Sequence, residues 1–261
     1  MGKERQPSKD GVESSESAKR MGRGCISLDA MNAGRDEMNL VEFPLAGLSD
    51  RTPAGRNSLV FEDSIWDRSR RENVRRRLKI TGSAQYGLPV ALDDEVILGL
   101  IQLSKATSFE SRYVAFRPAD LIRLLGWRLE GRSYDRIEKS LRRWLGITLY
   151  YDNAWWDNER KAWVDEHFHL VDHVVIRRHL RSGGSSVRRA EQAMGWSFAW
   201  NDIMFQSFRA GYMKQLDMKM YRSLKSPAAK RLYRFLDKRF HFSNDLKFDL
   251  KTFACEHIGF S

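Results

Sequence analysis

The hydrophobic pattern of the chain predicts a helix, a short strand and a second helix in close succession. An apolar-rich helix is expected over residues 93–105, a strand over Tyr113–Phe116, and the second helix from Pro118 to Gly126. Proline suits the first helical turn, where a backbone N–H has no intrahelical partner, and glycine suits the left-handed residue that ends a helix. This segment therefore predicts two helices joined through a strand.

A third helix and a hairpin are expected to follow. The apolar stripe of this helix recurs at spacings of three and four and consists of Tyr134, Ile137, Leu141 and Trp144. The hairpin is expected to have strands over 147–151 and 164–176, with a turn over 157–161. Two helices, the second after a tight turn, and then a hairpin are the order of a winged helix, a fold that binds DNA.

A similar pattern starts again near the C-terminus. A helix is expected from Pro227, a strand over the alternating run 246–250, and a helix that stops at Gly259. The sequence ends at Ser261, before a further helix or hairpin could follow. The pattern therefore predicts an α+β fold of tandem winged-helix domains, of which the second is incomplete.

Composition suggests where the units begin and end. Residues 1–37 have almost no aromatic or β-branched residues, so they are predicted to be a disordered tail. Residues 38–176 would form the first winged-helix domain with an N-terminal β-rich extension. The basic, Gly/Ser-rich segment 177–195 is predicted to be a linker. Residues 196–261 would form the partial second domain.

The charge of the chain favours a polyanionic partner. A formal net charge of +11 indicates nucleic acid before a membrane surface. The sequence lacks the run of about twenty apolar residues that a membrane helix needs, so no membrane association is expected. Its two cysteines lie far apart without metal-ligand spacing, which favours a reducing, cytoplasmic setting and no cofactor.

Two predicted helices carry basic faces. Cations on the third helix and at the hairpin turn are candidates for DNA contacts: Arg132, Arg136, Lys139, Arg142, Arg143, Arg160 and Lys161. An arginine on a groove-sized helix can pair with guanine or hold phosphates. The helix from Pro227 carries a second set, opposite an apolar stripe, for which phosphate contacts are expected: Lys230, Arg231, Arg234 and Lys238. An ordinary solvated face is the open alternative for both helices.

Several runs together resemble the replication initiator protein A family of bacterial plasmids. They are residues 38–44 (MNLVEFP), 124–127 (LLGW), 131–134 (GRSY), 151–158 (YDNAWWDN) and 226–240 (SPAAKRLYRFLDKRF). The resemblance covers about residues 36–261. It implies a bacterial protein with tandem winged-helix domains that bind repeated sites in double-stranded DNA at a plasmid origin. It also implies that the protein helps to open the duplex for host replication proteins. In related initiators the first domain often forms a homodimer, so the third helix could be an interface instead.

Two other functions remain open at this point. A winged-helix transcriptional regulator or autorepressor would use the same surfaces. A metal-dependent rolling-circle nicking enzyme is the third possibility, because His167 and His169 form a His–hydrophobe–His motif on one strand face. Its nucleophile would be one of three tyrosines, Tyr212, Tyr221 or Tyr233. The sequence has no phosphate-binding loop and no hydrolase elbow, so we expect a protein that is not an enzyme.

Overall fold

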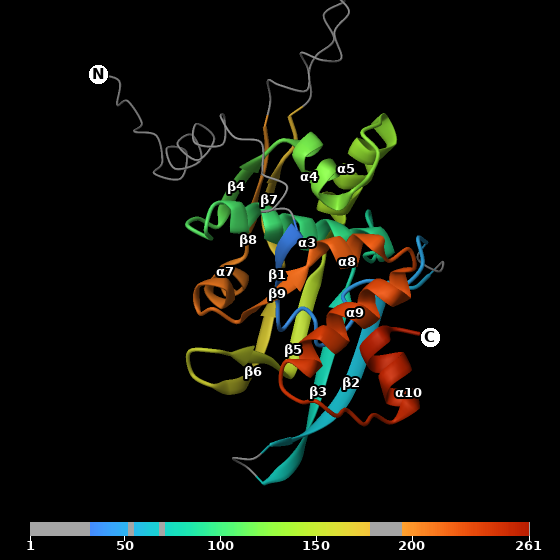
Figure 1. Ribbon diagram of the computed structural model, residues 1–261, viewed down its shortest axis with the longest axis vertical. Coiled ribbons are helices and arrows are strands. Elements are labelled where there is room, and N and C mark those ends of the chain that lie inside the picture. The colour runs from blue at the N-terminus through green and yellow to red at the C-terminus, as the bar shows by residue number, and fades with distance from the viewer. Residues whose placement is uncertain (1–31, 52–54, 68–70, 178–194, 261) are drawn as a thin grey trace, which may run out of the picture.

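The computed structural model describes residues 32–51, 55–67, 71–177 and 195–260 (Figure 1). In chain order the elements are β1 (Ala33–Glu37), β2 (Ser58–Asp67), β3 (Glu72–Thr81), α3 (Ala91–Ala106), β4 (Tyr113–Phe116), α4 (Pro118–Leu125), α5 (Gly131–Leu145), β5 (Thr148–Asp157), β6 (Ala162–Phe168), β7 (Val171–Val175), β8 (Trp196–Trp200), α7 (Asp202–Arg209), β9 (Met213–Asp217), α8 (Met218–Ser223), α9 (Pro227–Phe240), α10 (Leu250–Thr252) and the π-helical turn η2 (Phe253–Ile258). The fold mixes helices with antiparallel strands, in agreement with the predicted α+β class.

The helix α3 is the central element of the segment that contains α4 and α5. Figure 1 shows α3 crossing the molecule with α4 and α5 on one side of it. Its apolar run is almost wholly buried, and α4 approaches closely at Gly99, where an added Cβ would lie 2.5 Å from Leu121 Cδ1. The helix α4 ends at Gly126, whose φ of 71° is the left-handed cap that the sequence predicts. The predicted strand and both predicted helices of this segment are confirmed.

A three-stranded sheet joins this segment to a later part of the chain. The strand β8 lies between β4 and β7 and is antiparallel to both. Trp200 of β8 is buried, and its indole N–H donates to Ser104 Oγ of α3 at 2.8 Å. A domain boundary before residue 196 is therefore wrong, because β8 completes the sheet and the core of the preceding segment. Most of the predicted linker lies outside the described residues.

A four-stranded sheet has the order β2-β3-β5-β6 (Figure 1). The predicted hairpin turn is confirmed between β5 and β6, with Lys161 at a φ of 54°. The predicted returning strand over 164–176 is in fact two strands. The strand β6 pairs with β5, whereas β7 turns away and pairs with β8.

The strand β1 pairs with β9, far away in the sequence. Asp36 and Glu37 at its end are 1% and 0% exposed. The prediction of a disordered tail is therefore wrong for residues 33–37, because strand pairing and the buried ion pair between Asp36 and Arg234 hold them. Residues 1–31 lie outside the described residues.

The C-terminal part packs as helices against the four-stranded sheet. Figure 1 shows α9 and α10 beside β2 and β3. The predicted strand over 246–250 is wrong, since this segment is an extended lead into α10 that pairs with no described strand. Phe248 packs instead on Phe253 and Phe235, with ring centroids 5.0 and 5.7 Å apart, so an aromatic cluster takes the place of a ladder.

Candidate nucleic-acid interface

Three cations on α5 face solvent. Arg132, Arg136 and Lys139 are exposed, while Ile137 and Leu141 on the opposite side of the helix are completely buried. In the described part of the chain, none of the three takes part in an ion pair. Their charges are therefore available to an anion that approaches α5. Arg128, in the turn before α5, is also exposed, and we did not single it out from the sequence.

Arg143, at the end of α5, serves a different purpose. Its guanidinium donates to both carboxylate oxygens of Asp93 at 2.8 Å, and Asp93 is 1% exposed. Burial raises the pKa of Asp93 even though Arg143 favours its charged form. The indole N–H of Trp144 donates to the Asp93 carbonyl at 3.0 Å. These contacts fix α5 to the start of α3, so the prediction that Arg143 contacts DNA is corrected to a role in packing.

Arg142 lies between these two cases. It forms an ion pair with Glu138 at 3.0 Å, one helical turn away, and donates to the Tyr86 hydroxyl at 3.1 Å. Its side chain is 38% exposed. Arg142 can reach an anion only in competition with Glu138, so we leave it outside the central patch of Arg132, Arg136 and Lys139.

The two cations of the hairpin turn do not share a face with α5. Figure 1 places the β5–β6 turn and α5 toward opposite ends of the molecule. Arg160 is well exposed but forms an ion pair with Asp157 at 2.9 Å. Lys161 donates to Asn158 Oδ1 at 2.9 Å. Both stabilise the turn, and a ligand that covers α5 would not reach them in this arrangement.

The predicted basic face of α9 is turned into the protein. Arg234 is 1% exposed and holds Asp36 of β1 with two bonds of 2.7 and 2.9 Å. A third bond of 2.7 Å reaches Asp94 of α3. Its guanidinium therefore ties together three elements that are far apart in the sequence. The prediction that Arg234 contacts phosphate is wrong, because DNA cannot reach it.

The two cations before Arg234 are also engaged. Arg231 is buried and donates to the backbone carbonyls of His257 and Val41, each at 2.8 Å. Burial, with the nearby charge of Arg234, lowers the pKa of Arg231 to about 10. Lys230 forms an ion pair with Glu95 at 2.7 Å and is mostly covered. These two residues are therefore corrected to structural roles as well.

Lys238 belongs to a buried ionic cluster around Glu42. Its ammonium pairs with the Glu42 carboxylate and donates to the Met38 carbonyl at 2.6 Å. Arg76 of β3 reaches the same carboxylate at 2.7 Å, and Arg239 contacts it too. Burial alone would raise the pKa of Glu42, but these three cations hold it well below its usual value. Lys238 is thus another predicted DNA contact that instead stabilises the fold.

His257 of η2 lies against the same cluster and provides a test of how α9 and η2 are held. Its ring stacks on Phe235 and Phe43, and burial lowers its pKa from 6.5 to about 4. The unfolded chain binds this proton below pH 6.5, whereas the folded chain does not bind it until about pH 4. Stability should therefore be complete above pH 6.5 and fall as the pH drops toward 4.

We expect this histidine alone to lower the free energy of unfolding by about 2 kcal/mol between pH 8 and pH 5. A His257→Phe variant keeps a ring in the stack and should lose this part of the pH dependence. Urea unfolding at both pH values measures it. Equal pH dependence in the variant and the unsubstituted protein would contradict a neutral, buried His257.

The His–hydrophobe–His motif lies at the end of β6. His167 Nε2 is 3.2 Å from Asp152, and His169 Nδ1 is 2.7 Å from the Ile147 carbonyl. Among the described residues, no three metal-ligating side chains gather at one point. Burial raises the pKa of all three tyrosines proposed as nucleophile, Tyr212, Tyr221 and Tyr233, which disfavours their phenolate forms.

Within the described part of the chain, no helix has the length and apolar character that crossing a membrane requires.

Comparison with known proteins gives the family of the chain. The search of curated proteins returned no match. The crystal structure of selenomethionine derivatives of domains 2 and 3 of RctB is similar in fold, with a TM-score of 0.50 and 12% identity over 79% of this chain and 71% of that chain. A second crystal structure of RctB domains 2–3 aligns with a TM-score of 0.41 and 15% identity over 74% and 68%. The family model for replication initiator protein A matches residues 35–255, so the chain belongs to the replication initiator protein A family.

Proposed function

We propose that this protein initiates plasmid replication by binding double-stranded origin DNA through the exposed face of α5. It would act by binding, without catalysing a reaction, and would help host replication proteins to open the duplex. The observation that carries the proposal is the patch of Arg132, Arg136 and Lys139, which is exposed in a chain of an initiator family. Cations on a helix of this size can contact phosphates or base edges in the major groove.

The topology supports a winged-helix interpretation of this segment, with one change. The elements α3, β4, α4 and α5 supply the helices and first strand, and β7 and β8 supply the two antiparallel strands of the wing. The wing expected at β5–β6 belongs instead to the four-stranded sheet. Two hydrogen bonds join the chain just after β7 to the start of β8. The Arg177 guanidinium donates to the Gly195 carbonyl at 3.2 Å, and Trp196 Nε1 donates to the Arg177 carbonyl at 3.1 Å. Arg177 is exposed at this position.

The proposal predicts that affinity for duplex DNA falls as salt rises. Four cations, the α5 patch and Arg128, would neutralise about four phosphates, so the log–log slope of the association constant against salt should be about −3 to −4. Fluorescence anisotropy with a labelled duplex of mixed sequence measures it. A slope near zero would mean that the exposed cations are only solvated surface.

A homodimer through α5 is the alternative use of the same face. Leu129, in the turn before α5, and Leu145, the last residue of α5, are 44% and 40% exposed, and a protein interface could cover them. Light scattering on a variant without the three patch cations separates the two uses. Unchanged DNA binding with loss of a dimer would assign α5 to the interface. A transcriptional regulator would bind DNA with the same face, so replication of a plasmid that carries the gene is the distinguishing assay.

A further inference from the structure

The four-stranded sheet has an open edge at β2, next to an apolar groove. The strand β2 is the first in the order β2-β3-β5-β6, so one side of its backbone has no partner strand among the described residues. The outward N–H of Glu62 donates to the Glu256 carboxylate of η2 at 2.7 Å. Since outward groups alternate along a strand, the N–H and C=O of Val60 also point outward. Within the described residues, neither Val60 group is bonded.

The edge is blocked on both sides of Val60. Arg56 Nε reaches the Ser58 carbonyl at 3.4 Å, and Glu256 covers the Glu62 amide. One residue of an incoming extended chain could therefore exchange both of its backbone hydrogen bonds with Val60. Natural proteins usually protect sheet edges, and an exposed edge beside a pocket is the geometry of strand addition.

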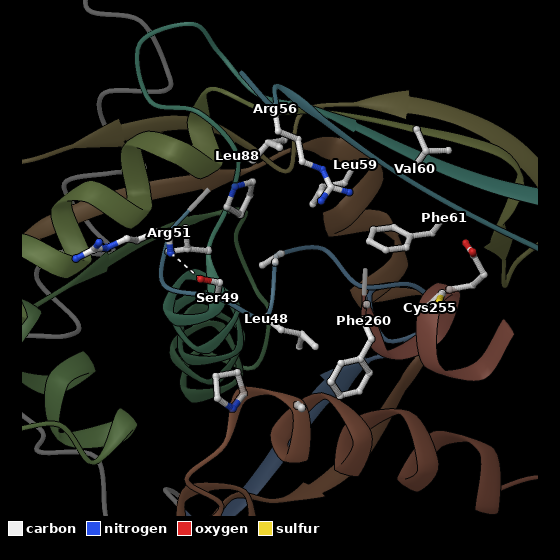
Figure 2. A pocket seen from close by; sticks show the side chains of 18 of the residues that line it. Leu48, Ser49, Arg51, Arg56, Leu59, Val60, Phe61, Leu88, Cys255 and Phe260 are labelled. Carbon is white, nitrogen blue, oxygen red and sulfur yellow. Dashed lines mark hydrogen bonds between the residues drawn. The ribbon is translucent and has the colours of Figure 1, made fainter. Parts of the chain in front are cut away.

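The groove beside this edge has a volume of about 580 Å³ (Figure 2), within the ~300–1,000 Å³ of ordinary ligand sites. Leu48, Leu59, Phe61 and Phe260 lie around it, and Val60 points away on the opposite face of the strand. A chain added along β2 would place alternate side chains toward the groove and the others toward solvent. Apolar side chains would fill the groove.

The rim of the groove determines the charge of the occupant. Arg51 and Arg56 are both exposed, and within the described ranges neither forms an ion pair. Among the described residues that line the groove, Glu256 has the one carboxylate, and it accepts a hydrogen bond from the Glu62 amide. Two unpaired guanidinium groups favour carboxylates on the partner, because arginine binds them through paired N–H donors.

We propose that this groove binds an extended segment of a partner protein that has alternating apolar residues and at least one acidic residue. The segment adds to β2 at Val60, inserts its apolar side chains beside Leu59 and Phe61, and directs its carboxylate to Arg51 or Arg56. This site is on a different surface from the α5 patch and does not depend on DNA binding.

The test uses the full chain with Cys25→Ser, which leaves Cys255, a residue that lines the groove, as the single thiol. A display library of short random peptides is selected on this protein, and the enriched peptides are synthesised. We expect enriched sequences to alternate apolar residues and include Asp or Glu, and to slow the reaction of Cys255 with a thiol reagent. Arg51→Glu with Arg56→Glu should weaken each peptide at least about fivefold.

The backbone contact is tested from both sides. Val60→Pro removes the outward N–H without removing a bond to β3, and should weaken binding about fivefold. Methylating each peptide amide in turn should reveal one position with a similar loss, even if the proline variant fails to fold. The proposal would be overturned if no peptides were enriched or if the peptides did not protect Cys255. It would also be overturned if peptide affinity changed neither with Val60→Pro nor with methylation of any peptide amide. If Cys255 were protected at higher protein concentration without any peptide, the proposal would be overturned, because a second copy of the chain would then occupy the groove.

Discussion

Replacing Arg234 by methionine should destabilise the protein by about 3–5 kcal/mol, because it leaves Asp36 buried without its partner. Asp36 is 1% exposed and receives two of the three hydrogen bonds that the Arg234 guanidinium donates. Methionine fills a similar volume, so the loss reports the stranded charge rather than a cavity. Urea unfolding at neutral pH measures the change in free energy.

A matched control and a second variant isolate the cause. Arg123→Met removes a 50% exposed arginine that pairs with Asp120, and should change stability by less than about 0.5 kcal/mol. Adding Asp36→Leu to Arg234→Met should recover part of the stability, because both buried charges are then absent. If Arg234→Met left stability intact and weakened DNA binding, the inward placement of the α9 cations would be wrong.

Removing the α5 patch should abolish most of the affinity for duplex DNA while leaving the fold intact. A variant with Arg132→Ala, Arg136→Ala and Lys139→Ala loses about three phosphate contacts. The magnitude of the salt slope should therefore fall by about 3, and affinity at low salt should fall by about a hundredfold. Alanine favours helix and all three positions are exposed, so we expect little change in unfolding free energy. Anisotropy titrations over a range of salt concentrations measure both effects.

The control for this variant removes the same net charge elsewhere. Arg75, Lys247 and Lys251 are exposed on β3 and near α10, toward the other end of the molecule from α5. Their replacement by alanine should leave the salt slope within about one of its original value. Equal losses in the two triple variants would mean that net charge, and not the α5 face, determines binding.

Local signals in the sequence predict the region around α5 well. Pro118 and Gly126 mark the ends of α4, and the stripe of Ile137, Leu141 and Trp144 gives the buried side of α5. Both signals depend only on residues that are close together in the sequence, so these helices can be predicted without knowing the rest of the fold. The exposed positions of Arg132, Arg136 and Lys139 follow directly from that stripe.

The orientation of α9 could not be predicted in the same way. Its apolar residues and its cations lie on separate faces, and the usual rule buries the apolar face. Here Arg234 and Lys238 are buried because Asp36 and Glu42, nearly two hundred residues earlier, supply buried carboxylates. Phe240, an apolar residue at the end of α9, is 52% exposed. A helix pattern cannot reveal such partners, although the acidic residues in the run 36–42 were a possible signal.

The position of β8 shows the same limitation. The alternation of Trp196, Phe198 and Trp200 predicts a strand correctly, but it does not say which strands lie on either side. The structure inserts β8 between β4 and β7, whereas β5 and β6 pair within the four-stranded sheet, so the wing that we propose consists of β7 and β8. Strands that are distant in the sequence pair because they share a core. The two-residue alternation of apolar side chains shows which face of a strand is buried, but it does not show which strands are its neighbours.

Photocrosslinking from single cysteines tests most directly whether α5, and not α9, contacts DNA. In a background with Cys25→Ser and Cys255→Ser, one variant carries Arg136→Cys on α5 and the other Phe240→Cys at the exposed end of α9. Each is labelled with an aryl azide and irradiated with a duplex of mixed sequence at low salt. We expect covalent protein–DNA products from position 136 and almost none from position 240. Products from position 240 with none from position 136 would contradict the central claim.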